Sequence, residues 1–474
     1  MTTTLAPDIC VVGAGSAGLS VAAGAAQLGA ETVLIEAHKM GGDCLNYGCV
    51  PSKALLAAAH AAEAQRRAGR FGVQANEPAT DFRAVHDHIH GVIAAIAPQD
   101  SEERFSGLGV RVLRAQARFA GPREIAAGDF RIRARRFVIA TGSTPLVPPL
   151  PGLEDVPYLT NETVFDLVER PRHLLVIGGG PIGVELAQAF RRLGAAVSVV
   201  EMATLLPKDD PELVQVVRQR LHDEGIALHE RTRVTGVEPT SDGVALLTES
   251  DGNKARIDGS HLLVAAGRRA NIAGLDLAAA GIAHTSAGIT VDSHLRTGNR
   301  RVYAIGDAVG GLQFTHLASY HAGIVIRHAL FRLRARVDLR LVPWVTYSDP
   351  ELAQIGLTEA NARAAGHAAE VLRWPFAEND RAQTERATAG LVKAVVTPGG
   401  RILGAAIVGA HAGELIQPWQ LAMANGLKIG ALATLVAPYP TLGEASKRAA
   451  GSFYTPKLFT KRTRRLVRFL RWFG

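Results

Sequence analysis

The sequence predicts an α/β protein in which one strand–turn–helix–strand unit occurs twice and a region of different character follows. Residues 8–36 read DICVVGAGSAGLSVAAGAAQLGAETVLIE, and residues 173–201 read HLLVIGGGPIGVELAQAFRRLGAAVSVVE. Each copy has an apolar run, a glycine-rich turn, a helical pattern and a second, β-branched run, which is the order of a βαβ unit. From Pro343 onward the pattern changes to short strands. We therefore expect two doubly wound α/β domains and a C-terminal α+β domain.

Strand-and-turn segments mark where these domains close. Residues 137–143 and 261–271 each read as a buried strand that enters a glycine turn, and residues 302–311 read as a strand that ends in Gly-Asp. The proline-rich stretch 144–152 is typical of a linker. The predicted division is a first domain 1–150, a second domain 151–272, a central segment 273–342 that returns to the first domain, a domain 343–456 and a basic segment 457–474.

Composition excludes several classes of protein. The 474-residue chain is 47% hydrophobic and 20% charged, which is typical of folded globular domains and not of disordered chains. Its three cysteines, Cys10, Cys44 and Cys49, exclude a secreted disulfide scaffold and a cluster of metal-binding thiolates, and no metal site is expected. The sequence shows neither a signal-peptide pattern nor an apolar run long enough to span a membrane. We therefore expect a cytoplasmic protein.

The first glycine-rich turn has the pattern of a dinucleotide site. Gly13 permits the tight turn, Gly15 lets the backbone approach a pyrophosphate, and Gly18 lets helix and strand pack closely. The pyrophosphate would lie on free N–H groups at the N-terminus of the following helix. An acid at the end of the next strand would accept a hydrogen bond from a ribose hydroxyl. The predicted contacts are Gly13, Gly15, Ser16, Ala17, Gly18 and Glu36.

The same spacing recurs 165 residues later and predicts a second dinucleotide site, with contacts Gly178, Gly180, Gly183, Glu201 and Gly267. Glu201 suits a free 2′-hydroxyl and would repel a 2′-phosphate, which usually requires an arginine. The nearby bases Arg191 and Arg192 fall on the preceding helix and not after the strand. We therefore expect NAD(H) to be favoured over NADP(H).

Two cysteines follow the first repeat directly. In a regular helix, residues five apart are separated by about 7.5 Å of rise, which is beyond the usual reach of a disulfide. Gly48 and Pro51 would let the first turn distort so that the sulfurs of Cys44 and Cys49 meet, and a helix N-terminus favours a thiolate. The residues are thus a candidate redox pair beside the first nucleotide. The alternative is two buried structural thiols.

Several motifs together resemble those of the class I pyridine nucleotide–disulfide oxidoreductases, the family of lipoamide dehydrogenase, glutathione reductase and mercuric reductase. The resemblance extends over residues 9 to 444, and the segments that match are GAGSAG, GGDCLNYGCVPSK, IATGS, GGGPIGVE, AAGRRAN, AIGDAVG and YSDPELAQIGLTE. The resemblance implies FAD at the first site and a nicotinamide nucleotide at the second. It also implies a homodimer built through the domain after Pro343, with the active site completed by the partner subunit.

The resemblance also implies roles for individual residues. Cys49 would be the thiolate that faces the flavin, and Cys44 would be the thiol that meets the substrate. Lys53 would lie near the flavin and pair with Glu185. The remaining implied FAD contacts are Gly142 and Ser143 on the adenine side, Asp307 at the ribityl–phosphate region and Thr315 through its backbone.

Two positions depart from the family pattern. Asp43 replaces the usual Thr before the first cysteine. Near the C-terminus the disulfide-reducing members carry His-Pro-x-x-x-Glu, whereas this chain has Tyr439, Pro440 and Glu444. A phenol has an ordinary pKa of about 10 against about 6.5 for imidazole, so Tyr439 is a poor base near neutral pH. Loss of general acid–base help would slow thiol exchange by about 10²–10⁴-fold.

Three functions follow from these residues. The first is lipoamide-dehydrogenase-like exchange between NAD(H), FAD and the Cys44–Cys49 disulfide, with Tyr439 and Glu444 completing the site. The second is a metal-ion reductase akin to mercuric reductase, which Tyr439 favours but the absence of any cysteine after Cys49 does not. The third is a flavin or quinone reductase, or a redox module, at the membrane. His316 and His411 are the alternative bases, and each is more simply explained as a structural histidine.

The net charge of +8 lies almost entirely in the basic segment 457–474, which carries seven basic and no acidic residues. The rest of the chain is nearly neutral, so nucleic acid is not an expected partner. Leu466, Phe469, Leu470 and Phe473 occupy one helical face, with arginines largely around the rest. This pattern predicts an amphipathic helix that contacts an anionic membrane surface or a partner. Alternatively, its apolar face docks on the domain before it.

Overall fold

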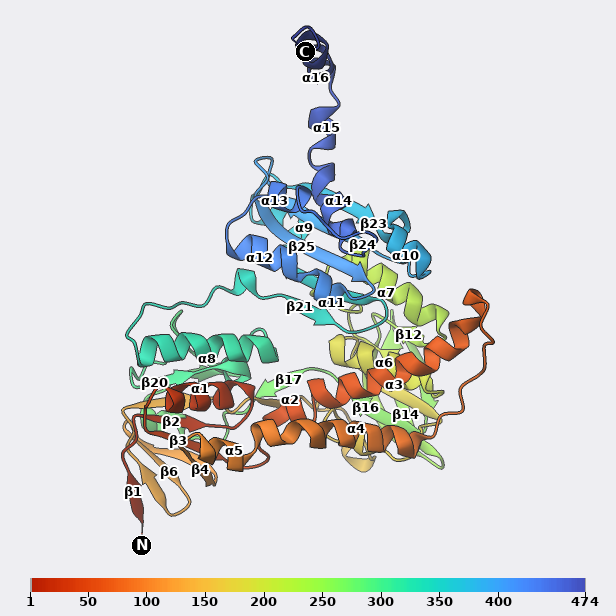
Figure 1. Ribbon diagram of the computed structural model, residues 1–474. Coiled ribbons are helices and arrows are strands. Elements are labelled where there is room, and N and C mark those ends of the chain that lie inside the picture. Colours follow the sequence, from red (N-terminus) through yellow and green to blue (C-terminus); the bar gives the residue numbers. More distant parts are fainter. Residues whose placement is uncertain (1, 474) are drawn as a thin grey trace. The chain divides into compact units, whose positions relative to one another are not determined.

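A computed structural model describes residues 2–473 of the chain (Figure 1). The chain forms two compact units. Unit 1 comprises the residues up to Met202 together with Ala227–Val337, and unit 2 comprises Ala203–Ile226 together with the residues from Asp338 onward. Residues 203–226 therefore belong in sequence to the predicted second domain but cluster in space with the C-terminal region.

The first βαβ repeat lies at the centre of a parallel five-stranded sheet in unit 1. In spatial order its strands are β20 (Val302–Ala304), β8 (Arg136–Ile139), β2 (Ile9–Val12), β3 (Thr32–Glu36) and β4 (Val110–Arg114). Alternate residues face opposite layers. Ile9 and Val11 pack in the cluster that includes helices α1 (Ser16–Gln27) and α8 (Thr315–Ala329), whereas Cys10 and Val12 pack in the cluster on the other face.

A second sheet covers that other face. Its strands are β1 (Thr3–Leu5), β7 (Phe130–Ile132), β6 (Glu124–Ala127) and β5 (Ala117–Gly121). Cys10 is fully buried in this core, and burial raises the pKa of its thiol, so it is an inert structural residue. The remaining helices of this half are α2 (Gly42–Asn46), α3 (Cys49–Arg67), α4 (Phe82–Ile96) and α5 (Glu102–Gly107). Figure 1 shows α3 and α4 running side by side.

The second repeat builds the same arrangement again. The parallel strands, in spatial order, are β12 (Ala227–His229), β11 (Ala196–Val200), β10 (His173–Ile177) and β16 (His261–Val264). Helix α6 (Pro181–Arg192) packs on β10 and β11. The antiparallel sheet of β13 (Arg233–Thr240), β14 (Gly243–Ser250) and β15 (Asn253–Gly259) shares a hydrophobic cluster with β10 and β16.

Two short ribbons complete the strands of unit 1. They are β9 (Ser143–Pro145) with β17 (Arg268–Ala270), and β18 (His284–Thr285) with β19 (Gly288–Ile289). The segment 137–143, predicted as a buried strand that enters a glycine turn, contains β8, a turn at Gly142, where φ is +71°, and the first residue of β9. The pairing of β9 with β17 brings the predicted linker 144–152 beside the strand-and-turn at 261–271.

Unit 2 is built on an antiparallel sheet, in accord with the strand-rich pattern that begins at Pro343. In spatial order its strands are β21 (Trp344–Thr346), β22 (Glu351–Gly356), β25 (Ile402–Gly409), β24 (Leu391–Val396) and β23 (Glu370–Pro375). One face holds the core, to which Trp419 contributes a fully buried ring. The helices are α7 (Pro211–Asp223), α9 (Glu359–Ala364), α10 (Asp380–Thr384), α11 (Ala412–Leu415), α12 (Gln417–Ala424), α13 (Ile429–Ala433), α14 (Glu444–Ser452), α15 (Thr455–Leu458) and α16 (Lys461–Leu470).

Helix α7 is attached to this sheet through buried polar side chains. Its cap, Asp210, accepts a hydrogen bond from the backbone N–H of Glu212, and its own N–H donates to Gln354 on β22. Lys393 on β24 is 5% exposed and lies 2.8 Å from both Asp210 and Glu212. Val392 and Ala394 alternate with Lys393 and point into the apolar core, so α7 covers the opposite, polar face. No helix within the described residues 2–473 is long and apolar enough to cross a membrane.

Candidate active site

The two glycine turns leave room for a ligand at the same position. A Cβ at Gly13 would lie 2.4 Å from the carbonyl oxygen of Ala140, and one at Gly18 would lie 1.8 Å from that of Gly13, so both positions require glycine. At Gly15 the nearest atom would be the Cα of Gly42, 3.8 Å away. Packing therefore explains the first and third glycines, whereas the second leaves free space before α1.

The second turn repeats this geometry. A Cβ at Gly178 would lie 2.3 Å from the oxygen of Ala265, and one at Gly183 would lie 2.0 Å from that of Gly178. Within the described chain, no neighbour comes within 4 Å of the corresponding position at Gly180. Neither α1 nor α6 has a side-chain cap among the described residues. Their first N–H groups can therefore receive phosphate oxygens.

An acid closes each turn. Glu36 is 8% exposed, and its carboxylate accepts hydrogen bonds from the N–H groups of Ala14 and His38, each at 2.6 Å. Glu201 accepts one from the N–H of Gly179 at 2.7 Å. Both carboxylates thus fix the glycine turn and stand at the strand end where a ribose would lie. Gly267 is open, because among the described residues only Leu146 comes within 4 Å of its Cβ position.

A break between two helices brings the cysteines together. Helix α2 ends at Asn46, and Gly48, with φ −120° and ψ −115°, starts α3 at Cys49. Cys44 therefore lies on one helix and Cys49 is the first residue of the next. The two thiols are not covalently joined, and Cys44 hydrogen-bonds to Cys49. A regular helix would hold them apart, so the glycine break is what permits the contact.

The environment of Cys49 favours its thiolate. The hydrogen bond from Cys44 lowers the pKa of Cys49 to about 6, against the opposing effect of burial. The hydroxyl of Thr315, whose Oγ1 lies 3.4 Å from the Cys49 sulfur, and the charge of Lys53 act in the same direction. Cys49 and Thr315 are the first residues of α3 and α8, and helix N-termini stabilise a thiolate. The same contact raises the pKa of Cys44, which is therefore the donor.

Lys53 lies one turn after Cys49 and forms an ion pair with Glu185 on α6. Their side-chain atoms are 2.7 Å apart, and Glu185 is 7% exposed whereas Lys53 is 36% exposed. The pairing implied by the family resemblance is present in the structure. Because α3 follows the first βαβ repeat and α6 belongs to the second, this ion pair connects the two repeats within unit 1.

Sequence reasoning missed the partner of Asp43. Arg268, on β17, lies 3.0 Å from the Asp43 carboxylate and donates hydrogen bonds to the hydroxyl and carbonyl oxygens of Ser143. The Ser143 hydroxyl in turn donates to Asp307 at 2.6 Å, and burial raises the pKa of Asp307. Asn161 donates to Asp43 from the side. Two features of the sequence indicated this contact. Arg268 provides a positive charge in the motif AAGRRAN, and Asp43 provides a negative charge where the family usually has Thr.

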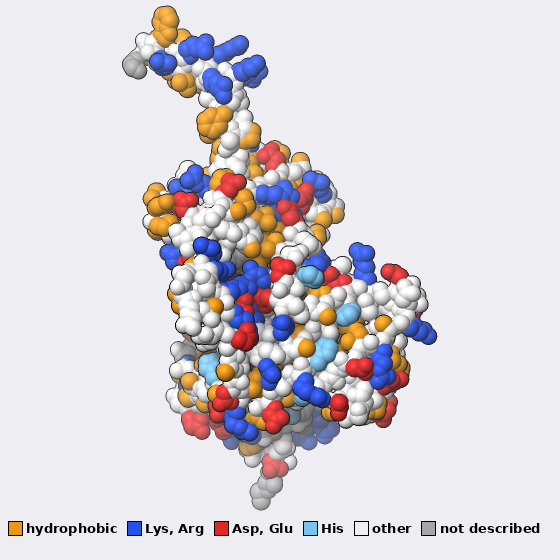
Figure 2. All heavy atoms as spheres, turned by 90° about the vertical axis from the view of Figure 1, so that its right-hand side faces the viewer, with side chains coloured by type: hydrophobic (Ala, Val, Ile, Leu, Met, Phe, Trp, Pro, Cys, Tyr) orange, Lys and Arg blue, Asp and Glu red, His pale blue; other side chains and the backbone are white. Residues whose placement is uncertain are grey.

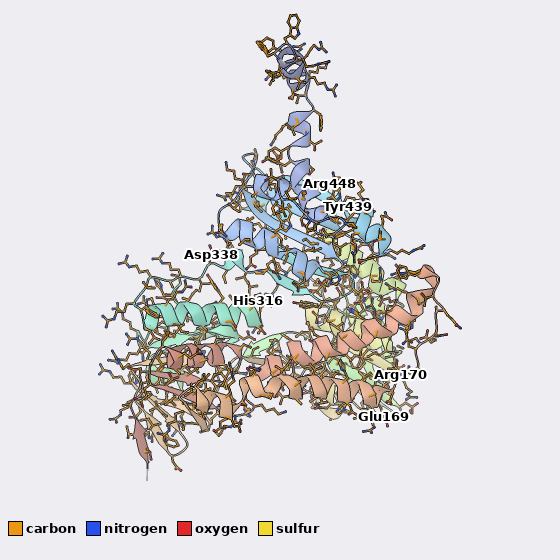
Figure 3. All side chains as sticks on the ribbon, viewed as in Figure 1. Glu169, Arg170, His316, Asp338, Tyr439 and Arg448 are labelled. Atoms are coloured by element: carbon orange, nitrogen blue, oxygen red, sulfur yellow. The ribbon has the colours of Figure 1, made fainter. Side chains whose placement is uncertain are left out.

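Tyr439 and Glu444 belong to unit 2. The Tyr439 hydroxyl donates a hydrogen bond to Asp380 at 2.9 Å, and this contact raises the pKa of the phenol, to which Glu444 also contributes. Tyr439 is 71% exposed and precedes α14, which starts at Glu444 (Figure 3). The phenol therefore keeps its proton near neutral pH. Cys44, Cys49, Lys53, Glu185 and Thr315 come together within unit 1.

The two alternative histidines differ in setting. His316 follows Thr315 on α8, and its ring stacks on that of Phe314 with centroids 5.3 Å apart. His411 adopts φ +58° immediately before α11 in unit 2. In the described part of the chain, no group of three or more potential ligands could hold a metal ion.

Comparison with protein families identifies the whole arrangement. The model of the pyridine nucleotide-disulphide oxidoreductases matches residues 7–322, and the model of their dimerisation domain matches residues 342–450. The chain belongs to this family. It is an FAD-dependent disulfide oxidoreductase that acts on a small-molecule substrate. Its dimerisation domain indicates a homodimer.

The similarity of this oxidoreductase to known relatives extends over nearly its full length. A mercuric reductase of Streptomyces lividans is 36% identical over 455 residues, which cover 94% of this chain and 96% of the relative. A dihydrolipoyl dehydrogenase of Thermus scotoductus is 37% identical over 454 residues, which cover 94% and 97%.

Solved structures show the same architecture. The flavoprotein disulfide reductase RclA of Escherichia coli, as its Cu(II) complex, is 28% identical with a TM-score of 0.83, covering 93% of this chain and 98% of that one. LpdA of Mycobacterium tuberculosis is 28% identical with a TM-score of 0.85, covering 95% and 99%. The predicted family and fold class are confirmed.

Proposed function

We propose that this oxidoreductase uses NADH to reduce a small disulfide, or runs that reaction in reverse, through the Cys44–Cys49 pair. The observation that carries the proposal is the environment of Cys49, which receives a hydrogen bond from Cys44 and has its pKa lowered to about 6. At neutral pH the reduced pair is then one thiolate and one thiol, which is the state that exchange with a disulfide requires.

The residues of the first turn fit FAD. Gly15 leaves free space in front of the N-terminus of α1, and Glu36 stands where a ribose hydroxyl would donate. When bound, FAD supplies two-electron transfer between a nicotinamide and a disulfide. The residues that would hold it are Gly13, Gly15, Ser16, Ala17, Gly18, Glu36, Lys53, Gly142, Ser143, Asp307 and Thr315. Those that would hold the nicotinamide nucleotide are Gly178, Gly180, Gly183, Glu201 and Gly267.

The exchange can be written with the chain's own sulfurs. Cys44 passes its proton to Cys49 along their hydrogen bond and attacks one sulfur of the substrate disulfide RSSR, which releases RS⁻. This leaving group takes the proton from Cys49 and departs as RSH. The Cys49 thiolate then attacks the Cys44 sulfur, closes the Cys44–Cys49 disulfide and expels the second RS⁻. The pair is oxidised by two electrons and the substrate is reduced by two.

Glu201 supports NADH as the preferred nucleotide. Its carboxylate stands at the end of β11 and would repel a 2′-phosphate. Met202, which follows, is exposed and uncharged, whereas Arg192 is only 2% exposed and so cannot reach a ligand. The cysteine usage further supports the reducing cytoplasm as the compartment. We also propose that a fraction of the enzyme molecules is bound to the inner face of the membrane through the basic segment 457–474.

Metal-ion reduction is the second candidate. Tyr439 in place of histidine favours it, and the similarity to mercuric reductases and to a Cu(II)-binding reductase points the same way. Against it stand Glu201 and the lack of any cysteine after Cys49 to deliver a metal.

Steady-state rates with each nicotinamide nucleotide decide between these functions. Purified holoenzyme would be assayed with lipoamide and dihydrolipoamide, with Hg(II) and Cu(II), and with a soluble quinone. We expect the highest kcat/KM with the disulfide and NADH. Cys44→Ala should abolish disulfide turnover while keeping ferricyanide reduction, which needs no exchange thiol. Faster turnover of a metal ion or the quinone than of the disulfide contradicts the proposal.

A further inference from the structure

In the described part of the chain, the groups that act on Cys44 and Cys49 are those of Thr315, Lys53 and Glu185, and none of them belongs to the basic segment 457–474. In unit 2, Figure 1 shows α15 and α16 extending away from the β21–β25 sheet. Thr460 caps α16 by accepting a hydrogen bond from the N–H of Thr463. All residues from Lys461 to Phe473 except Thr463 are exposed, including Trp472 at 87% and Phe473 at 75%. The apolar face of α16 is therefore not covered by the rest of unit 2.

Helix α16 separates its side chains into two faces. Leu466, Phe469 and Leu470 lie on one side, and Phe473 continues this side beyond the last turn. Five bases occupy the opposite side, whereas Arg462, one turn before Leu466, lies on the apolar side in the first turn. None of these six bases is paired with a carboxylate in the part of the chain that the structure describes. Figure 2 shows blue basic side chains gathered along this segment beside orange hydrophobic ones. The five bases are Lys461, Arg464, Arg465, Arg468 and Arg471.

Charge and exposed apolar area together select the ligand. A nucleic acid would neutralise the arginines but would leave three aromatic rings, those of Phe469, Trp472 and Phe473, in water. An anionic bilayer receives both faces, because the apolar residues enter the acyl boundary while the bases meet the headgroups. Each base held at an anionic surface strengthens partition by about fivefold. A homodimer presents two such helices, so their binding adds by avidity.

We propose that α16 is an interfacial helix that holds this oxidoreductase on anionic phospholipid. The partner is the lipid surface itself, and Trp472 lies at its headgroup level. The proposal does not depend on which substrate the cysteines reduce, because it rests on the faces of α16 alone.

Sedimentation with vesicles tests the proposal on the intact FAD-loaded dimer. The protein should pellet with vesicles of phosphatidylglycerol and phosphatidylcholine at low salt, remain in solution with phosphatidylcholine alone, and be released at high salt. A form truncated after Pro456 should stay in solution with its FAD retained. Equal sedimentation of the intact and truncated forms overturns the proposal.

A permuted segment provides the matched control. The variant Arg464→Leu, Leu466→Arg keeps composition and charge but spreads the apolar residues around the whole circumference of the helix, so that no apolar face remains. We expect its binding to phosphatidylglycerol vesicles to fall by about tenfold or more. Unchanged binding would mean charge attraction alone and would refute an interfacial helix.

Fluorescence of Trp472 separates lipid contact from docking on protein. The spectrum of Trp472→Phe is subtracted to remove the other tryptophans. The difference spectrum should be that of an exposed indole without vesicles and should shift to the blue with them. A blue-shifted Trp472 in the lipid-free dimer would show that the segment docks on the protein itself, and the proposal would fail.

Discussion

The surroundings of Cys49 lower the pKa of its thiol, whereas those of the other two cysteines raise it. Its thiolate is stabilised first by the hydrogen bond from Cys44 and then by Thr315 and Lys53. Cys10, by contrast, is a buried thiol whose pKa is raised. Reactivity therefore follows position in the fold, because the same side chain is inert in the sheet and nucleophilic at the start of α3.

Removing the Cys44 donor should raise the pKa of Cys49. In reduced protein, iodoacetamide alkylation of Cys49, followed by mass spectrometry, should have its midpoint near pH 6. Because the hydrogen bond stabilises the charged form, Cys44→Ala should move this midpoint upward by about one unit or more. Thr315→Val removes a weaker contact and should move it less. An unchanged midpoint in Cys44→Ala would refute the stated cause.

Tyr439 limits exchange with thiol substrates if its phenol stands where a base is needed. We expect Tyr439→His to raise kcat/KM for dihydrolipoamide by about tenfold or more, because an imidazole near Glu444 and Asp380 can accept a proton at neutral pH. Tyr158→His, at another exposed tyrosine, should have no such effect. A fall in kcat/KM would indicate that the pocket has adapted to a substrate other than a dithiol.

The Asp43–Arg268 pair joins the cysteine segment to β17. Arg268→Gln should destabilise the protein by about 1–3 kcal/mol and weaken FAD retention, because hydrogen bonds to Asp43 and Ser143 are lost together. Chemical denaturation and gel-filtered FAD content measure the two effects. Arg269→Gln, on the exposed neighbour, is the control. If Asp43→Asn and Arg268→Gln are fully additive in the double variant, the two side chains do not interact.

Elements differ in how far the sequence predicted them. The two βαβ units could be predicted because the turn in each unit leaves no room for a Cβ at its first and third glycines. These are Gly13 and Gly18 in the first unit and Gly178 and Gly183 in the second. The sequence could not predict that α7 packs with the C-terminal sheet, because an amphipathic helix does not specify which sheet covers it. Nor could it predict the Asp43–Arg268 contact, since distant segments meet only after β9 pairs with β17.

The attachment of α7 through Lys393 can be tested directly. Lys393 and Asp210 are 5% and 4% exposed, and Lys393 also lowers the pKa of Glu212, which stands at about 2 chiefly through Arg373. Lys393→Met should destabilise the protein by about 3–5 kcal/mol, because Asp210 is left buried without its counter-ion. The free energy of unfolding in urea measures this. Lys428→Met, at an exposed lysine of the same unit, should change it little, and an equal loss in both variants would contradict the argument.

For the whole molecule, the main feature is that the predicted site residues are divided between the two units of the chain. The cysteine pair lies in unit 1, whereas Tyr439 and Glu444 lie in unit 2. The family resemblance implies that each site takes its cysteines from one subunit and its Tyr439–Glu444 segment from the other. A site assembled in this way can be recognised by mixing subunits that are defective in different parts.

Subunit mixing should restore activity in a defined proportion. Cys49→Ala and Glu444→Ala homodimers should each be nearly inactive with a disulfide substrate. After co-expression with two affinity tags, a heterodimer has one site that carries both defects and one in which the Cys49 of the Glu444→Ala subunit meets the Glu444 of the Cys49→Ala subunit. The purified heterodimer should therefore show about half the wild-type kcat, and a randomly exchanged mixture about a quarter. If both residues served the same subunit's site, every site in the heterodimer would carry one defect, and its activity would stay at the level of the single variants.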